Sequence, residues 1–234
     1  MQKFWKRPKS YRLSLDLRDV LLLGIGGLLM LAGIKAINAF QDHRTVLAPK
    51  SSHISITWLP DTVSRWHEPI EAMSKRYNID PDLLAIIMTM ESGGYTQADS
   101  GQAQGLMQIA PTTAGDIAKR YVKQPVDRYD LKDSATSIEF GAAYLAKLRD
   151  IYGAASQGPS WNTTVELMAA AYNGGFGAAN SLEKGEGLGD TQTVVYSRDA
   201  FNMWRERHAA KSPTFERWKE RGGQELIDKA HQEL

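Results

Sequence analysis

The sequence contains no cysteine, no excess of either charge and no phosphate-binding glycine loop after a strand. The absence of cysteine excludes disulfides, thiolate zinc sites, a cysteine nucleophile and a lipidated cysteine. The five histidines lack the spacing of metal ligands, so we expect no metal and no other cofactor. With 28 Lys+Arg against 27 Asp+Glu, the net charge of +1 is not that of a typical nucleic-acid-binding protein, and we expect no nucleic-acid partner.

One long apolar run is present, from Val20 to Ile34, and five basic residues precede the first acidic one in the segment before it: Lys3, Lys6, Arg7, Lys9 and Arg12. Extended past Lys35 to Phe40, the run approaches the ~20 residues that span a bilayer. It is therefore predicted to be a transmembrane signal anchor over residues 20–40, with residues 1–19 in the cytoplasm and the rest of the chain on the other side. A cleaved signal peptide and a buried core helix are the alternatives, although Ile37 to Ala39 fits a small-x-small cleavage site poorly.

Residues 41–60 are polar and lack helical period, which predicts a linker, with the globular domain beginning near Asp61. After an amphipathic segment from Thr62 to Tyr77, Asp80-Pro81 is a helix start, with Asp as the N-cap and Pro at the first helical position. The helix that follows is apolar nearly all round, which predicts a buried central helix. It should end at Glu91-Ser92-Gly93-Gly94, because paired glycines interrupt helices.

Further amphipathic patterns predict helices along the rest of the chain, and no alternating strand pattern rises above noise. The expected helices begin at Pro111, cover Ser134–Tyr152, pass through Leu167 to a stop at Gly174-Gly175, and cover Thr191–Arg207 and Thr214–His231. The fold class is therefore predicted to be mainly α. Residues 199–234 are expected to be a helical extension that packs on the domain, with contact to a partner protein as the alternative.

A carboxylate at the C-terminal end of a very apolar helix is unusual. Glu91 is surrounded in sequence by apolar residues such as Ile87, Met88 and Met90. An apolar site disfavours the charged form, and the negative end of the helix dipole acts in the same direction, so both should raise the pKa of Glu91. Such a group can act as a general acid near neutral pH. The alternative is an ordinary solvated glutamate at a helix end.

Three motifs follow one another around this residue. Glu91-Ser92 is followed by Ser100, then by Gly105 to Ile109 (GLMQI), then by Ala171 to Gly175 (AYNGG). Their order and spacing resemble the lytic transglycosylases related to the soluble Slt enzyme, a family with a lysozyme-like fold. Further matches to the family are Asp133, the helical segment from Ile138 to Leu145, Thr193 and Tyr196.

The resemblance covers roughly Asp61 to Tyr196 and implies a lysozyme-like catalytic domain over residues 61–198. Three positions depart from the family: Gln102 stands where Gly is common, Ser137 replaces a frequent Asn, and Gln192 stands where many relatives have Glu. The last departure puts a role for that carboxylate in doubt, and none of the three affects Glu91.

The family resemblance implies a reaction on peptidoglycan glycan strands, between N-acetylmuramic acid and N-acetylglucosamine. Glu91 would protonate the leaving oxygen and then, ionised, take the proton of the sugar's own 6-hydroxyl, which closes a 1,6-anhydro ring without water. One carboxylate suffices if the substrate's N-acetyl group stabilises the cationic centre, in contrast to the two carboxylates of ordinary glycosidases.

The resemblance also implies a set of substrate contacts, which are Ser100, Met107, Gln108, Glu139, Tyr172, Asn173 and Tyr196. Gln108 and Asn173 offer amide groups to the sugar, and the two tyrosines offer a ring face with a polar tip. Met107 fits the core equally well. Glu139 fits a substrate contact or a structural contact, and neither it nor Asp99 is expected to act as a second catalytic carboxylate.

The implied location is the bacterial inner membrane, with a single membrane pass and a periplasmic catalytic domain. Two other functions remain open. One is a muramidase that hydrolyses the same bond. The other is a non-catalytic peptidoglycan-binding component of an envelope-spanning secretion or conjugation machine, which would have protein partners there.

Overall fold

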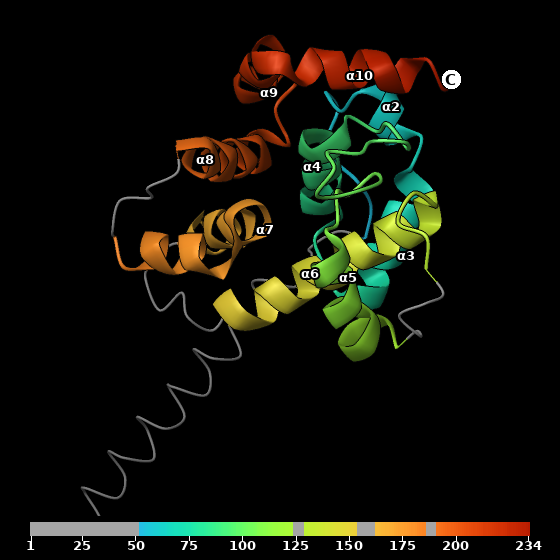
Figure 1. Cartoon of the computed structure of the whole chain (residues 1–234). Helices are drawn as coiled ribbons and strands as arrows, with labels where there is room; N and C mark the ends of the chain where they lie inside the picture. Colours follow the sequence, from blue (N-terminus) through green and yellow to red (C-terminus); the bar gives the residue numbers. More distant parts are fainter. Residues whose placement is uncertain (1–51, 124–128, 154–161, 186–190) are drawn as a thin grey trace, which may run out of the picture. The chain divides into compact units, whose positions relative to one another are not determined.

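The computed structural model describes residues 52–123, 129–153, 162–185 and 191–234 (Figure 1). The predicted signal anchor over residues 20–40, the basic segment 1–19 and most of the predicted linker lie outside the described residues. Within the described ranges, no helix has the length and apolar character required to cross a membrane.

The described residues form helices joined by loops, which confirms the mainly α prediction. The helices are α2 (Asp61–Ser64), α3 (His67–Tyr77), α4 (Pro81–Ser92), α5 (Pro111–Ile117), η1 (Ala118–Val122), α6 (Ser134–Tyr152), α7 (Asn162–Glu183), α8 (Thr191–Glu206), α9 (Pro213–Trp218), η2 (Lys219–Gly223) and α10 (Gln224–His231). In the part of the chain that is described, extended pairing is limited to two isolated bridges, in the loop between α4 and α5.

Helix α4 is the buried central helix that its sequence predicts. All of its residues except Glu91 are buried, because apolar side chains surround its axis. Asp80 caps its start by accepting the N–H of Asp82 at 2.9 Å, and Gly93 ends it with a left-handed φ of 60°. The helix contacts α3, α6, α8 and α10, so it is held from several sides.

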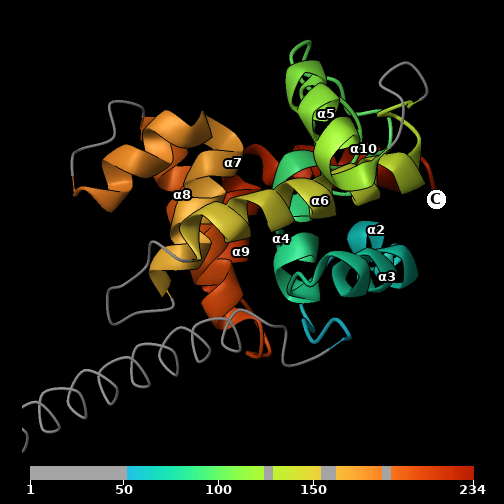
Figure 2. The same cartoon turned by 90° about the horizontal axis from the view of Figure 1, so that it is seen from below.

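Helices α7 and α8 pack closely against each other on one side of α4, and α3 lies against α4 and α6 on the other. Figure 2 shows α6 crossing the molecule from α7 towards α5. The loop from Tyr95 to Ala110, which joins α4 to α5, contacts α4 at Ser92 and α6 at Ser137. This arrangement brings the last turn of α4, the loop and α8 to one region of the molecule.

Residues 54–58, which the sequence analysis assigned to a linker, are hydrogen-bonded to the helices. Ser55 donates its N–H and its hydroxyl to the two oxygens of Asp82, at 2.7 and 2.6 Å. Ile54 donates its N–H to Glu71 at 3.0 Å, and the Trp58 indole donates to the carbonyl of Glu206 at 3.2 Å. The folded part therefore begins before Asp61. An extended segment that is held by individual polar contacts has no hydrophobic periodicity. The sequence therefore contains no indication that residues 54–58 belong to the folded part.

Two predicted helices are interrupted by glycines. The helix that was expected to stop at Gly174-Gly175 continues as α7 after a kink at Gly175, where φ is 76° and ψ is 179°. The helix that was expected over Thr214–His231 is broken at Gly222, where φ is 112°. Helices α9 and α10 pack on α8 and α4, with Ile227 and Ala230 buried.

Candidate active site

Glu91 lies in the last turn of α4 with its side chain partly buried. The Tyr196 hydroxyl, from α8, donates a hydrogen bond to its Oε1 at 2.5 Å. Burial raises the pKa of Glu91 to about 7, against a smaller lowering by the Tyr196 hydrogen bond. The sequence-based expectation of a raised pKa is therefore met, and Glu91 can both give and take a proton near neutral pH.

Two tyrosines from α7 and α8 stand beside this carboxylate. The Tyr172 hydroxyl donates to the carbonyl of Met107 at 2.7 Å, and its ring packs on Tyr144 with centroids 5.1 Å apart. Burial and the charge of Glu91 raise the pKa of Tyr172 and of Tyr196 well above its usual value. Both phenols are therefore neutral hydrogen-bond donors near neutral pH.

The loop that holds Met107 is fixed on both sides by serine hydroxyls. Ser92, next to Glu91, donates to the carbonyl of Leu106 at 2.8 Å and accepts the N–H of Gly94 at 3.1 Å. Ser137, on α6, accepts the N–H of Met107 at 3.1 Å. Neither positioning role was predicted from the sequence, although the adjacency of Ser92 to Glu91 was a signal for the first.

Gly105 allows the loop to approach the backbone next to α6. Its φ is 77°, and a Cβ at this position would lie 1.9 Å from the carbonyl oxygen of Leu131. No other residue type fits without movement of the backbone. The glycine of the GLMQI motif is thus explained by contact within the protein.

The Met107 side chain is fully buried, and a Cβ on Gly141 would lie 2.6 Å from its Cγ. The predicted substrate contact is therefore corrected in favour of its alternative, a core residue. Gln108 has a left-handed φ of 43°, and its Nε2 donates to the carbonyls of Ala98 and Gly105, both at 3.0 Å. The amide nitrogen of Gln108 thus stabilises the loop, and its amide oxygen takes no part in these two hydrogen bonds.

Asn173 on α7 forms a side-chain hydrogen bond with Thr193 on α8. Its Oδ1 accepts the hydroxyl of Thr193 at 3.0 Å. The helices come so close here that a Cβ on Gly174 would lie 2.6 Å from the methyl group of Thr193. Because Thr193 lies one helical turn before Tyr196, this contact orients the residue that binds Glu91.

The two other carboxylates considered from the sequence are paired with cations. Asp99 is exposed and lies 3.0 Å from the Lys132 ammonium, and a hydrogen bond from the N–H of Gly101 together with this lysine lowers its pKa. Glu139 pairs with Arg76 at 2.7 Å and accepts the Tyr77 hydroxyl at 3.0 Å. The contacts of Glu139 are structural ones, between α6 and α3.

Ser100 lies exposed at the turn of the loop, where its hydroxyl oxygen accepts the N–H of Ala103 at 3.1 Å. The structure thus groups Tyr172 and Tyr196 with Glu91, and it places Ser100 and Glu139 in other contacts. Among the described residues, no three His, Cys, Asp or Glu side chains come together as a possible metal site.

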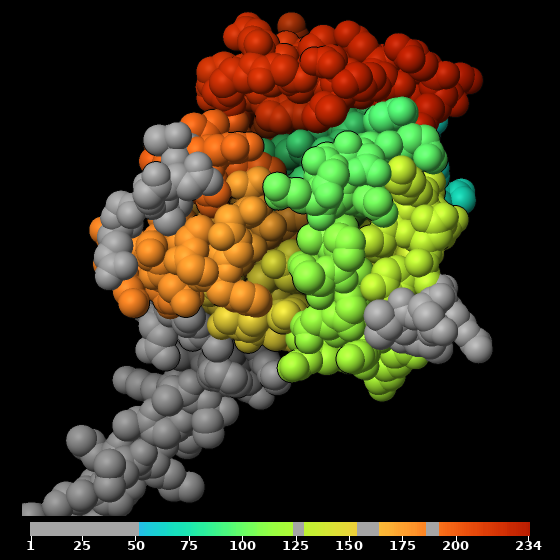
Figure 3. All heavy atoms as spheres, in the orientation of Figure 1, coloured from blue at the N-terminus to red at the C-terminus, as the bar shows by residue number. Residues whose placement is uncertain are grey.

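The surface carries a hollow in this part of the molecule. Figure 3 shows it between the surface of α7 and α8 (orange) and that of the 95–122 segment (green), with deeper-lying atoms between the two. The C-terminal helices (red) lie across one end of it. The elements on its two sides are those that carry the tyrosines and the glycine-containing loop.

The family model described as "Transglycosylase SLT domain" matches residues 68–195. The chain is 40% identical over 89 residues to "Membrane-bound lytic murein transglycosylase E" of Buchnera aphidicola, an alignment that covers 36% of this chain and 42% of the relative. It is also 40% identical over 149 residues to "Membrane-bound lytic murein transglycosylase C" of Mannheimia succiniciproducens, which covers 60% of this chain and 41% of the relative.

The matched part of the chain thus spans about two fifths of the length of these curated relatives. Among solved structures, the chain is similar to the lytic transglycosylase Slt of Pseudomonas aeruginosa, with a TM-score of 0.49 and 21% identity over 63% of this chain and 25% of that one. A similarity of that size adds nothing to the sequence matches.

Proposed function

The chain belongs to the transglycosylase SLT domain family, and from that premise we propose that it is a peptidoglycan lytic transglycosylase with Glu91 as its acid and base. The observation that carries the proposal is the state of Glu91. It is a carboxyl group with a pKa of about 7 that accepts, among the described residues, one hydrogen bond, from Tyr196. It stands at the position that the motif order of the family predicts.

In the first step, protonated Glu91 gives its proton to the oxygen that links N-acetylmuramic acid to N-acetylglucosamine. The bond from the anomeric carbon to that oxygen breaks, and the electron pair leaves with the oxygen. The Glu91 carboxyl is suited to this step because burial holds its proton up to about pH 7. The N-acetyl group of the substrate stabilises the cationic centre in place of a second carboxylate.

In the second step, ionised Glu91 takes the proton of the 6-hydroxyl of the same muramic acid. The hydroxyl oxygen attacks the anomeric carbon and closes the 1,6-anhydro ring, so the carboxyl group returns to its protonated form. Tyr196 supports this cycle because its neutral hydroxyl holds Oε1 in both protonation states. Within the described residues, Oε2 has no hydrogen-bond partner, which leaves it for the substrate.

Among the predicted substrate contacts, we retain four residues in this proposal: Gln108, Tyr172, Asn173 and Tyr196. Asn173 is exposed beside the tyrosines, and Gln108 has an amide oxygen left after its two loop contacts. Ser100 and Glu139 are weaker candidates, because the side-chain contacts of both lie within the protein.

Cleavage of purified sacculi in ¹⁸O-labelled water tests the reaction. Lytic transglycosylation gives products that end in 1,6-anhydro-muramic acid, carry no label and are one water lighter than hydrolytic products. Label at the new reducing end would instead identify a muramidase. An inverting hydrolase needs a second carboxylate ~6.5–9.5 Å from the first to activate water. The two carboxylates that were considered for this role, Asp99 and Glu139, are both engaged by cations.

We also propose membrane anchoring through residues 20–40, with the domain in the periplasm. The apolar run, its basic flank and the words "membrane-bound" in the names of the relatives support it. A reporter that is active only outside the cytoplasm, fused after Leu234, should be active. Activity of a cytosolic reporter at the same position would contradict this location, and a soluble periplasmic form lacking the first forty or so residues would favour a cleaved signal.

A non-catalytic role in a secretion or conjugation machine makes the opposite prediction for activity. A soluble fragment from about Ser52 would then bind sacculi without releasing fragments. Turnover of the wall by this fragment would exclude that alternative.

A further inference from the structure

We infer that the C-terminal segment Pro213–Leu234 is a brace that holds Glu91 against Tyr196, with ionic contacts at Glu233 and at Arg221. The inference rests on the proposed function for the role of Glu91. The brace spans the two helices that supply the Glu91–Tyr196 hydrogen bond, because α10 contacts α4 and α9 contacts α8. Neither ionic residue touches Glu91, so both are positioning residues.

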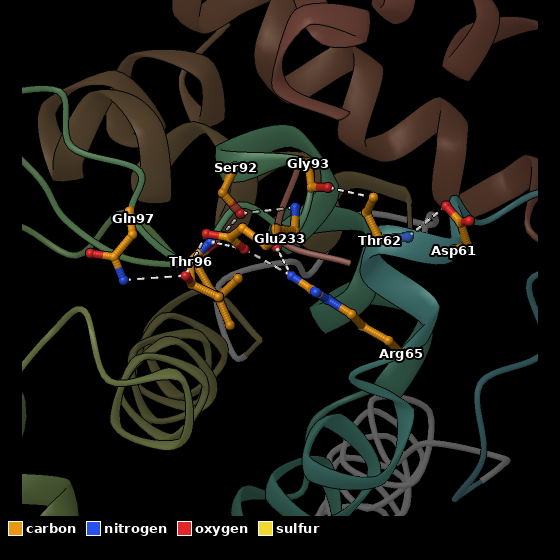
Figure 4. Close-up of polar contacts among 10 residues, drawn as sticks. Asp61, Thr62, Arg65, Ser92, Gly93, Thr96, Gln97 and Glu233 are labelled. Carbon is orange, nitrogen blue, oxygen red and sulfur yellow. Dashed lines mark hydrogen bonds and ion pairs between the residues drawn. The ribbon is translucent and has the colours of Figure 1, made fainter. Parts of the chain in front are cut away.

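The first contact is a carboxylate with three donors (Figure 4). Glu233 Oε2 accepts Arg65 Nη2 at 2.9 Å and the N–H of Thr96 at 3.1 Å, while Oε1 accepts the Thr96 hydroxyl at 2.6 Å. Burial opposes the charge of Glu233, but the hydrogen bonds from Thr96 and Arg65 outweigh it and lower the pKa of this carboxyl. Glu233 is therefore ionised wherever Glu91 is active.

These contacts reach the turn that directly follows Glu91. Arg65 Nη2 also donates to the carbonyl of Gly94 at 3.1 Å, and the Thr62 hydroxyl donates to that of Gly93 at 2.7 Å. The α10 backbone lies so close that a Cβ on Gly93 would be 2.8 Å from the nitrogen of Ile227. The end of α4 is thus enclosed between α2 and α10.

The second contact is on α8. Arg221 pairs with Asp199, whose carboxylate is mostly buried and lies three residues after Tyr196. Further along α8, Glu206 accepts the N–H of Thr214 at 3.1 Å and its hydroxyl at 2.9 Å. The brace is therefore attached to α8 at two points, Thr214 in α9 and Arg221 in η2, and it cannot shift without moving that helix.

The geometry has a consequence for the chemistry of Glu91. Among the described residues, the titratable groups next to it are Tyr172 and Tyr196, and both are neutral near pH 7. Its pKa is raised mainly by burial, against a smaller lowering by the Tyr196 hydrogen bond. Release of the brace would let water reach the end of α4. Burial is the larger influence on Glu91, so the pKa should then fall, even though loss of the Tyr196 bond alone would raise it.

The test compares Glu233→Ala with Glu233→Gln and with Glu225→Ala in the full chain. The Glu225 variant is the matched control, because it breaks only the exposed pair of Glu225 with Lys229 on the same helix. For each protein, the pKa of Glu91 is measured by carboxyl ¹³C NMR, and kcat and KM are measured on sacculi across pH. Melting temperatures establish that the variants are folded.

We expect Glu233→Ala to lower the pKa of Glu91 by at least ~1 unit and kcat at pH 7 by roughly tenfold, with KM changed less than twofold. Glu233→Gln keeps an oxygen for Thr96 and should recover part of both losses. Glu225→Ala should match the parent. A folded Glu233→Ala variant with the parent's Glu91 pKa and kcat would overturn the brace.

If Glu233→Ala does not fold, Thr96→Val replaces it. This variant removes the hydrogen bond from the Thr96 hydroxyl to Glu233 and keeps the one from the backbone N–H. The pKa of Glu91 and kcat are then measured as for Glu233→Ala. The brace and the reaction can fail separately. If the products are hydrolytic but the pKa of Glu91 falls in Glu233→Ala, the brace is supported and the proposed reaction is contradicted. If the products are anhydro-muropeptides but the pKa of Glu91 is unchanged, the reaction is supported and the brace is contradicted.

Discussion

The two ends of α4 carry carboxylates in opposite circumstances. At the start of the helix, Asp82 accepts two hydrogen bonds from Ser55, and Asp80 accepts the N–H of Asp82 and the indole N–H of Trp204. The positive end of the helix dipole favours both charges there. At the other end, Glu91 faces the negative end of the dipole, and within the described residues it accepts a single hydrogen bond, from Tyr196.

Burial alone does not make a carboxylate at an end of α4 suited to proton transfer. Burial also raises the pKa of Asp80, but the hydrogen bond from Trp204 and the other donors hold that carboxylate in place as a helix cap. Glu91 has one donor against its burial, and its pKa reaches about 7. A structural carboxylate is satisfied in its charged form, whereas a carboxylate used for proton transfer is left with both forms accessible.

The largest effect is expected from Glu91→Gln. An amide can neither give nor take the proton, so release of muropeptides from sacculi should fall by about 10³-fold or more, with the fold intact by circular dichroism. Asp99→Asn and Glu139→Gln are the controls, and each should change the rate by less than about tenfold. Substantial turnover by folded Glu91→Gln would remove Glu91 from its role.

The same substitution should change how stability depends on pH. The folded pKa of Glu91 is raised from 4.5 to about 7, so the folded protein binds the proton more tightly and loses stability as pH rises through this window. The loss at pH 8 is up to about 3 kcal/mol, since each pKa unit corresponds to ~1.4 kcal/mol. Glu91→Gln should therefore be more stable than the parent in urea at pH 8 and equal to it at pH 4. Equal stability at both pH values would contradict the raised pKa.

The central helix, its two ends and the position of Glu91 could be predicted from the sequence, because capping residues, apolar periodicity and paired glycines are local signals. The sequence could not show that Tyr172 binds the loop carbonyl of Met107 or that Tyr196 meets Glu91, since these contacts join distant segments. It implied a substrate contact for Met107 because motif membership does not reveal which way a side chain faces. It missed Ser55 because an extended segment has no period.

Tyr196→Phe removes the hydroxyl that donates to Glu91 and leaves the ring in place. Because this hydrogen bond lowers the pKa of Glu91, its loss should raise that pKa and move the alkaline limb of the pH–rate profile to higher pH. We expect kcat at pH 7 to fall about 10- to 100-fold as the carboxyl loses its orientation. A profile that moves to lower pH would show that water entry outweighs the lost bond.

Ser55→Ala is the matched change at the other end of α4, since it also removes a hydroxyl donor to a carboxylate. Asp82 keeps the N–H of residue 55 at 2.7 Å, so the cost should be about 1–2 kcal/mol in urea unfolding. Turnover per folded molecule should stay within about twofold of that of the parent. In free energy this is less than about 0.5 kcal/mol, the size of effect that neutral substitutions have. A loss of kcat as large as that of Tyr196→Phe would mean that the two ends of α4 are coupled.

The hydrogen bond between Tyr196 and Glu91 joins residues 105 positions apart, and that between Glu233 and Arg65 joins residues 168 apart. Contacts of such long range form only after much of the chain has already been ordered, because closing large loops costs entropy that local contacts do not repay. Partly folded chains would thus carry Glu91 as an ordinary, solvated glutamate. The raised pKa that the proposed acid and base needs would therefore be acquired only as folding is completed.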